Sequence, residues 1–163
     1  YTAYRHISDQ DVQALKAYLF SLDPIRQPNK AHQLDWYLMR AGLALWKYLE
    51  QRQPPPASFT GSRGAYVINI LGHCNECHTP RNMIGILQLD RAFSGNEDLS
   101  APDISAGALQ EWSDEELEDL FIYGALRDGD YVSDHMAEVV EYSSSRWSPQ
   151  DMQAAIEYLH SEK

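Results

Sequence analysis

The stretch Gly72-His-Cys-Asn-Glu-Cys-His-Thr-Pro-Arg-Asn82 contains both cysteines of the chain, Cys74 and Cys77, and His78 follows the second one directly. Two cysteines so close together do not form the framework of a small disulfide-rich domain. The two intervening residues place the thiols about one helical turn apart, beside the imidazole. The spacing therefore predicts a binding site on a short turn of helix.

Cys74-Asn-Glu-Cys-His78 has the C-x-x-C-H spacing of covalent haem attachment. In such a site the two thiols bond to the two vinyl groups of one haem, and the adjacent imidazole binds the iron. We therefore expect one haem c, attached through Cys74 and Cys77, with His78 as the proximal iron ligand.

Other uses of the two thiols stay open at this point. A zinc site would need two more ligands from His73, His78 or His135, because the chain has no second C-x-x-C pair. A thioredoxin-like thiol pair needs a βαβ pattern, which the sequence does not show. A plain buried pair of cysteines would leave the long loops of the chain unexplained.

A methionine is the expected sixth ligand, because a thioether sulfur stabilises ferrous iron and leaves no open position for oxygen or peroxide. The first and last of the four methionines fall within other predicted helices, and the second is too near His78 to reach the opposite face of the haem. The four are Met39, Met83, Met136 and Met152. Met136 follows a glycine-containing loop and is our candidate. Its neighbour His135 is the alternative ligand and would give a lower potential.

The rest of the chain has helical patterns and no alternating strand pattern. Ser113-Asp-Glu-Glu116 is a capping box at the start of a helix that reaches about Tyr123. Loops as long as the one over residues 79–111 usually surround a ligand in so small a domain. We expect an all-α fold of about four to five helices with long loops, preceded by an extra N-terminal helical segment. The helices expected after residue 60 are Arg63–Leu71, Ser113–Tyr123, Ser133–Tyr142 and Ser148–Ser161.

An internal repeat links the two ends of the chain. Ser8–Ser21 and Ser148–Ser161 are identical at eight of fourteen aligned positions, and both are typical of a capped amphipathic helix. Prolines end the first copy, a second helix is expected over Leu34–Leu49, and the run Gln53-Pro-Pro-Pro56 marks a boundary. The expected segments are a terminal helix over residues 1–22, a connector over 23–57 and a domain over 58–163.

Charge and hydropathy exclude several classes of protein. The 163 residues carry 13 Lys and Arg against 24 Asp and Glu, a formal charge of −11, which disfavours nucleic acid and anionic lipid as partners. The most apolar stretch, Leu34–Leu49, contains three charged residues and is shorter than a membrane span. The first residues lack the features of a signal peptide, so we expect a mature protein or a piece of a longer one.

Several landmarks in order resemble class I c-type cytochrome domains, and particularly the tandem-domain cytochrome subunits of periplasmic dehydrogenases. The likeness covers Ser62–Ser161, and its landmarks are Gly64-Ala-Tyr66, the C-x-x-C-H stretch, Ala101–Ile104, Trp112–Leu117, Met136–Val140 and Glu157-Tyr-Leu159. It implies that Met136 binds the iron and that Gly64 and Tyr66 meet Tyr158 at a close helix crossing. It also implies that residues 1–22 resemble the end of a preceding cytochrome domain. A fragment of a multi-haem chain and a lid folded on the remaining domain both stay open.

The resemblance implies an electron carrier without catalytic activity of its own, located in the periplasm or secreted. Its donor is a periplasmic dehydrogenase and its acceptor is a haem domain, a copper protein or an oxidase. The alternative is a haem enzyme or a gas or redox sensor with a displaceable sixth ligand. Around the haem, Arg81 and Trp112 are candidates for binding the propionates. Arg81 as a solvated loop charge stays open, and so does the acidic run Glu111–Asp119 as either a docking patch or a solvated helix face.

Overall fold

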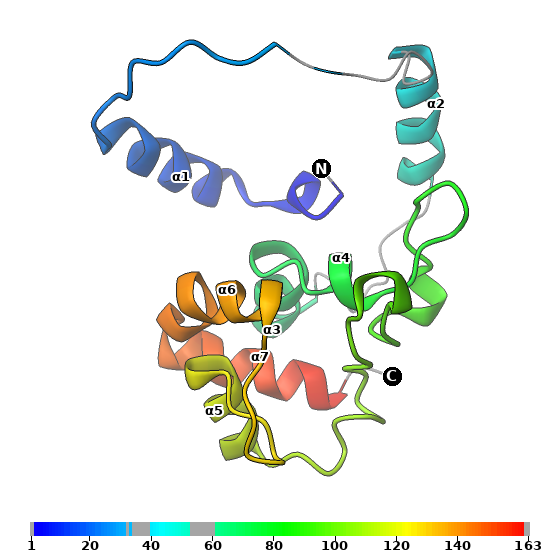
Figure 1. Ribbon diagram of the computed structural model, residues 1–163, viewed down its shortest axis with the longest axis vertical. Helices are drawn as coiled ribbons and strands as arrows, with labels where there is room; N and C mark the ends of the chain where they lie inside the picture. Colours follow the sequence, from blue (N-terminus) through cyan, green and yellow to red (C-terminus); the bar gives the residue numbers. More distant parts are fainter. Residues whose placement is uncertain (1, 32, 34–39, 53–60, 162–163) are drawn as a thin grey trace. The chain divides into compact units, whose positions relative to one another are not determined.

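The computed structural model describes residues 2–31, 33, 40–52 and 61–161. Within these residues the regular structure is helical, and the bridges Arg81–Leu87, Asn96–Ala101 and Ala125–Tyr131 are isolated rather than part of a strand. Figure 1 shows the helices in chain order. The expected all-α class is confirmed. No helix in the described part of the chain is both long and apolar enough to cross a bilayer.

The chain divides into two compact units. One comprises residues 1–6 and 55–163, and the other comprises residues 7–54. The second unit contains α1 (Asp9–Ser21) and α2 (Arg40–Gln51). The first half of the helix expected over Leu34–Leu49, the boundary expected at Gln53–Pro56 and Met39 lie outside the described residues.

The first unit contains five α-helices in its described part, joined by turns. Its segments are η1 (Tyr4–His6), α3 (Arg63–Tyr66), η3 (Val67–Leu71), α4 (Asn75–His78), η4 (Leu89–Arg91), η5 (Glu97–Leu99), α5 (Asp114–Tyr123), α6 (Asp134–Tyr142), η6 (Ser144–Arg146) and α7 (Pro149–Ser161). The expected capping box of α5 is present: Ser113 Oγ accepts from Glu116 N at 3.2 Å, and Glu116 Oε2 accepts from Ser113 N at 2.8 Å. The capping box that the sequence predicts at Ser113 is therefore confirmed.

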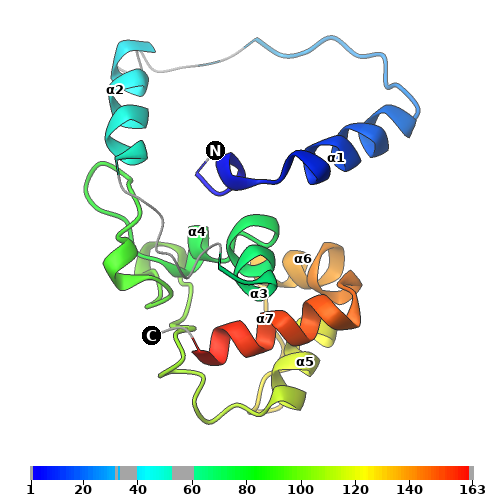
Figure 2. The ribbon, with the colours of Figure 1, turned by 180° about the vertical axis from the view of Figure 1, so that it is seen from behind.

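The core of this unit forms where α3 crosses α7 (Figures 1 and 2). A Cβ atom at Gly64 would overlap the carbonyl oxygen of Ala154 and lie 2.7 Å from Cβ of Tyr158. The expected approach of Gly64 to Tyr158 is thus confirmed, and it depends on the absence of a side chain at residue 64. The buried cluster around the crossing comprises Ala65, Val67, Ile68, Phe93, Leu109, Leu117, Phe121, Met152, Ala155, Ile156, Tyr158 and Leu159.

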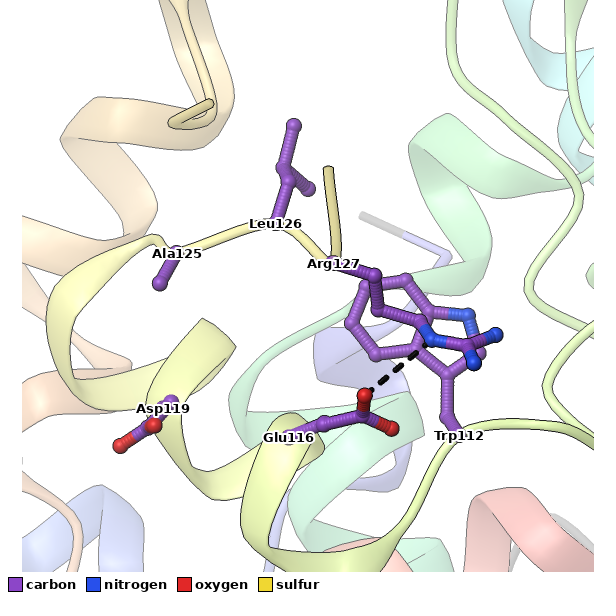
Figure 3. A pocket seen from close by; sticks show the side chains of 6 residues that line it. All are labelled: Trp112, Glu116, Asp119, Ala125, Leu126 and Arg127. Carbon is purple, nitrogen blue, oxygen red and sulfur yellow. Dashed lines mark hydrogen bonds and ion pairs between the residues drawn. The ribbon is translucent and has the colours of Figure 1, made fainter. Parts of the chain in front are cut away.

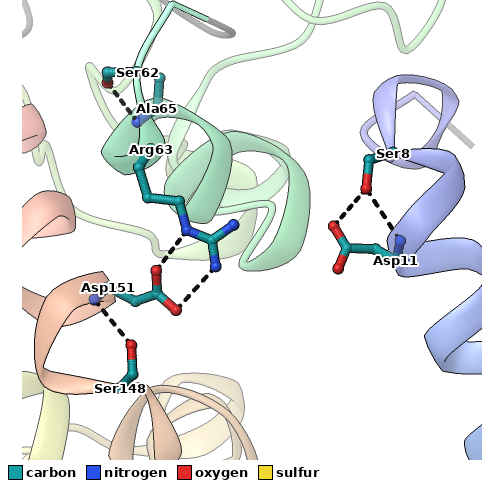
Figure 4. A network of polar contacts seen from close by, with 7 residues as sticks. All are labelled: Ser8, Asp11, Ser62, Arg63, Ala65, Ser148 and Asp151. Atoms are coloured by element: carbon teal, nitrogen blue, oxygen red, sulfur yellow. Dashed lines mark hydrogen bonds and ion pairs between the residues drawn. The ribbon is translucent and has the colours of Figure 1, made fainter.

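The crossing is also joined by polar contacts. Arg63 donates to both carboxylate oxygens of Asp151, with Nε at 2.6 Å and Nη2 at 3.0 Å, and Ser148 Oγ accepts from the backbone N–H of Asp151 (Figure 4). The other copy of the repeat has the same cap, because Ser8 Oγ accepts from the backbone N–H of Asp11 at 3.1 Å. The two copies of the repeat are therefore helices with equivalent caps.

The two copies of the repeat differ in how far their side chains are buried. In α7, Met152, Ala155, Ile156, Tyr158 and Leu159 are buried. In α1 no residue is buried, and the matching Tyr18 and Leu19 are 62% and 60% exposed. The same pattern of side chains is thus core in one copy and surface in the other.

Candidate haem-attachment site

The C-x-x-C-H motif forms the expected single turn of helix. Cys74 precedes α4, and its carbonyl oxygen accepts from Cys77 N at 3.2 Å and from His78 N at 2.9 Å. The preceding segment supports this turn, because Cys74 N donates to Ile68 O in the π-helical turn η3 at 2.9 Å. The two thiols and the imidazole therefore project from one turn.

The two cysteines differ in environment and are not joined by a disulfide. Cys77 is exposed, whereas Cys74 is partly buried and packs against the core. Burial raises the pKa of the Cys74 thiol to about 12. Cys74 thus lies on the inner side of the turn and Cys77 on the outer side.

His78 is buried, and its ring is oriented by one hydrogen bond. Nδ1 of His78 lies 2.8 Å from the backbone oxygen of Pro102. Because a carbonyl oxygen only accepts, Nδ1 carries the proton, and Nε2 keeps the lone pair that binds a metal. Burial is the main reason that the pKa of His78 lies below its usual value. The imidazole is thus held neutral, which is the protonation state of an iron ligand.

The loop that supplies Pro102 is fastened to the end of α4. Gly95 N donates to His78 O at 2.9 Å, and Phe93 N donates to Thr79 Oγ1 at 3.0 Å. Ile104 N in turn donates to Phe93 O at 2.8 Å. In the sequence, residues 101–104 stand out only as a landmark of the resemblance. The role of Pro102 could not be predicted, because no side-chain pattern indicates a backbone acceptor.

Two features of this turn fit a haem attached there. Asn75, next to Cys74, is 5% exposed, and its Oδ1 has no hydrogen-bond partner within the described structure. At Gly72, a Cβ would lie 3.4 Å from Sγ of Cys74 and 3.4 Å from the ring of Trp147. The attachment turn thus has a buried amide oxygen without a partner in the described structure, and Cys74 and Trp147 both lie close to Gly72.

The methionines and His135 occupy different environments. Met136 is half-buried in the first turn of α6. Met152 is 5% exposed within the core, and Met83 is fully exposed at the tip of a turn. The His135 side chain is 98% exposed, and its Nδ1 lies 4.0 Å from Glu138 Oε2. Within residues 2–31, 33, 40–52 and 61–161, no three His, Cys, Asp or Glu side chains are grouped to hold a metal ion.

Curated relatives match the chain over nearly its whole length. It is 33% identical to a protein named diheme cytochrome c-type from Cereibacter sphaeroides, over 98% of this chain and 56% of that protein. It is 32% identical to the fructose dehydrogenase cytochrome subunit of Gluconobacter japonicus, over 99% of this chain and 36% of that protein. Over almost its whole length the chain is thus similar to cytochrome subunits and cytochrome c proteins. The gluconate 2-dehydrogenase cytochrome c subunit of Pantoea cypripedii is also 32% identical, over 99% of this chain and 41% of that subunit.

The chain spans between about a third and a little over half of the length of these relatives, from 36% to 56%. No family model matches it. The likeness to cytochrome subunits of dehydrogenases that the sequence landmarks indicated is confirmed by these relatives.

In the first unit, Arg81 contacts groups of the protein itself. Its Nη2 lies 2.6 Å from Oε2 of Glu76, and its Nη1 donates to Gly85 O at 2.9 Å. This guanidinium thus contacts a residue between the two cysteines and the loop that follows them. The sequence suggested that Arg81 is either a propionate ligand or a solvated charge, and neither interpretation predicted these contacts.

Trp112 lies half-buried against the core of the first unit. The guanidinium of Arg127 lies over its ring at 5.8 Å from the centroid and pairs with Glu116 at 3.2 Å (Figure 3). Arg127 also lies 3.7 Å from a carboxylate oxygen of Glu111. Trp112, Glu116 and Arg127 border a crevice of about 70 Å³, far smaller than a ligand pocket of several hundred Å³. Two carboxylates of the acidic run are thus paired within the molecule.

Proposed function

We propose that the chain carries one haem c, bound through thioether links to Cys74 and Cys77, with His78 and Met136 as axial ligands of the iron. The hydrogen bond from His78 Nδ1 to the Pro102 carbonyl is the observation that carries this proposal, because it presents Nε2 of a buried neutral imidazole beside two cysteines at attachment spacing. The names of two relatives support it, since both are named as cytochrome c.

The bound haem supplies one-electron chemistry at its iron. The residues of this chain do the rest. Two cysteines hold the group by covalent bonds, the carbonyl of Pro102 keeps the imidazole in one orientation, and the core at the α3–α7 crossing limits movement of the surrounding helices. A rigid site of this kind keeps the structural change that accompanies each electron small.

Met136 is supported by burial. The sulfur of Met152 is buried in the core and that of Met83 is fully in solvent, so both are poorly placed to bind the iron. Met136 is half-buried at the start of α6. A thioether there completes a six-coordinate iron, so we infer a carrier of electrons that binds no substrate at the metal.

The role follows from this ligation. We infer that the protein passes electrons from a dehydrogenase to a haem, copper or oxidase acceptor and that it works in the periplasm or outside the cell, where this kind of haem attachment takes place. The relatives from Gluconobacter japonicus and Pantoea cypripedii are named as subunits of dehydrogenases, which supports the donor. The net charge of −11 favours a basic docking surface on the partner.

We also infer that the first segment of the chain, residues 1–22, includes a terminal helix of a second cytochrome-type domain, joined to the domain at 58–163 by a connector at 23–57. The support is the repeat: α1 repeats the pattern of α7, but its Tyr18 and Leu19 are exposed, whereas Tyr158 and Leu159 of α7 are buried. We then expect Tyr18→Ala to raise the equilibrium constant for unfolding of the native gene product at least tenfold. An equal effect in the native product and in this 163-residue chain contradicts it.

The colour and intact mass of the purified protein test the haem itself. We expect red protein whose mass exceeds that of the polypeptide by one haem and keeps that excess after denaturation. Replacing both Cys74 and Cys77 with Ala should release the haem on denaturation. Colourless protein with the mass of the bare polypeptide contradicts the proposal.

The reaction with carbon monoxide separates the carrier from a haem enzyme or gas sensor. With Met136 bound, the ferrous protein should not bind carbon monoxide rapidly at neutral pH. Rapid binding in the unmodified protein would show an open or displaceable sixth position and would favour the enzyme or sensor.

A further inference from the structure

The first described residues of the chain lie against the attachment turn. We call Thr2–His6 the N-terminal strap; it belongs to the same compact unit as α4. Thr2 Oγ1 donates to Oε1 of Glu76, and Tyr4 meets the ring of His73 edge-on, with the centroids 5.5 Å apart. Ala3, between these contacts, is 7% exposed. The strap therefore contacts residues on both sides of Cys74.

Glu76 connects the strap to a third segment. While Oε1 of Glu76 accepts from the strap, Oε2 pairs with Nη2 of Arg81 at 2.6 Å. The guanidinium of Arg81 also donates to the backbone oxygens of Glu76, at 3.2 Å, and Gly85, at 2.9 Å. The side chains of Glu76 and Arg81 are 20% and 31% exposed, so the pair is partly shielded from solvent. Charge-assisted hydrogen bonds in such a setting are stronger than exposed ones.

The helix that carries these contacts needs support. α4 has four residues, and a single helical turn is not stable by itself, because nucleation of a helix is unfavourable. Covalent attachment uses the thiols on either side of Asn75 and Glu76 and no atom of these two residues. Asn75 is buried. The Glu76 side chain is therefore available to hold the turn from outside.

We propose that Glu76 is a positioning residue: its carboxylate holds the N-terminal strap and the Arg81 loop together and thereby holds the turn that carries Cys77 and His78. The contacts themselves do not depend on a bound haem. The role of these contacts in holding an iron ligand rests on the proposed function. The positioning role of Glu76 and the haem proposal therefore fail in different experiments.

Trypsin cleavage after Arg5 measures whether the strap is seated, because this arginine lies within it. Release of the peptide Tyr1–Arg5 is followed by mass spectrometry on the intact chain under native conditions. We expect release at least ten times faster in Glu76→Ala and in Thr2→Val than in the unmodified protein. An unchanged rate in Glu76→Ala overturns the proposal.

Asp151→Ala is the matched control, because it removes the carboxylate of another arginine pair in the same unit, Arg63–Asp151. It should leave the cleavage rate after Arg5 within twofold of the unmodified protein. An equal acceleration in this control would mean that cleavage reports general loosening, and it would overturn the specific role of Glu76.

Hydrogen exchange at the Cys77 and His78 amides, which donate to Cys74 O, reports on the turn itself. We expect Glu76→Ala and Arg81→Leu to accelerate exchange at both amides by at least tenfold, and Asp151→Ala to leave it unchanged. Arg81→Leu should also accelerate cleavage of the strap, because Arg81 is connected to the strap through Glu76. Unchanged exchange in Glu76→Ala, in a variant with normal helix content, overturns the positioning role whether or not haem is bound.

Discussion

Asn69 in η3 and Tyr158 in α7 are joined, beside the crossing of α3 and α7, by a hydrogen bond of 2.9 Å from the side-chain amide to the hydroxyl. The same amide donates to Ala65 O at 3.0 Å. Asn69 is fully buried and Tyr158 is 6% exposed. The aromatic ring thus fills the core while its hydroxyl meets a polar group that has no contact with water, so the crossing is specified by both packing and hydrogen bonding.

Tyrosines at equivalent positions of the repeat should respond differently to truncation. Tyr158→Ala leaves a cavity and removes one of the two acceptors of the buried Asn69 amide, so we expect a loss of about 3–5 kcal/mol in the free energy of unfolding. Tyr18→Ala alters a side chain that is 62% exposed, and we expect a change within about 0.5 kcal/mol. Denaturant unfolding of both variants measures the difference. Similar losses in the two variants would mean that α1 has a core of its own in this chain.

Gly64 should not tolerate a methyl group. Because its Cβ would overlap the backbone of Ala154, Gly64→Ala has to separate α3 from α7, and we expect a loss of about 1–3 kcal/mol. Gly42→Ala in α2 is the control, since nothing lies within 4 Å of a Cβ there. It should be neutral or stabilise by up to about 1 kcal/mol. Thermal unfolding of both variants tests the comparison, and a neutral Gly64→Ala contradicts the close crossing.

The Arg63–Asp151 pair predicts a pH dependence of stability. Hydrogen bonds from Arg63 are the main reason that the pKa of Asp151 lies below its usual value. A carboxyl with a lowered pKa in the folded state stabilises the fold above its unfolded pKa, near 3.8, and this stabilisation is lost as the pH falls through the folded value. Relative to Asp151→Asn, the unmodified protein should lose stability between about pH 5 and about pH 2.

The size of this effect is limited by solvent. The side chain of Arg63 is 52% exposed, so we expect the difference between the two proteins to stay below about 1 kcal/mol. Denaturant midpoints measured across the acid range provide the data. Glu157→Gln alters another carboxylate on α7 and serves as the control. A pH profile of Asp151→Asn that matches that of the unmodified protein would contradict this prediction.

Axial ligation can be assigned by three substitutions in the haem-loaded protein. Met136→Ala should abolish the weak long-wavelength band of sulfur–iron ligation in the ferric state and lower the midpoint potential, because the soft ligand that favours ferrous iron is lost. Met152→Ala should keep the band and lose stability, since Met152 is a core residue. If His135→Ala removes the sixth ligand instead, our assignment of Met136 is wrong.

Local features of the site and fold were predictable from the sequence. The turn at Cys74–His78 and the caps at Ser113 and Ser148 depend on residues within five positions of one another, and the structure contains all three. The partner of His78 was not predictable, because it is a backbone oxygen 24 residues further along the chain. Arg81 illustrates the same limit. Its type predicts a carboxylate partner, but only the folded loop shows that Glu76 is the carboxylate within reach.

The sequence by itself determined the helical class, the attachment turn and the repeat, because helix caps and the spacing of apolar or thiol side chains operate over a few residues. Tertiary structure alone decided which copy of the repeat is buried and how the imidazole is oriented. It also decided that the chain's first residues contact the turn between its two cysteines. Each of these depends on groups distant in sequence that pack together, and a side chain's burial is set by what lies opposite it rather than by its own pattern.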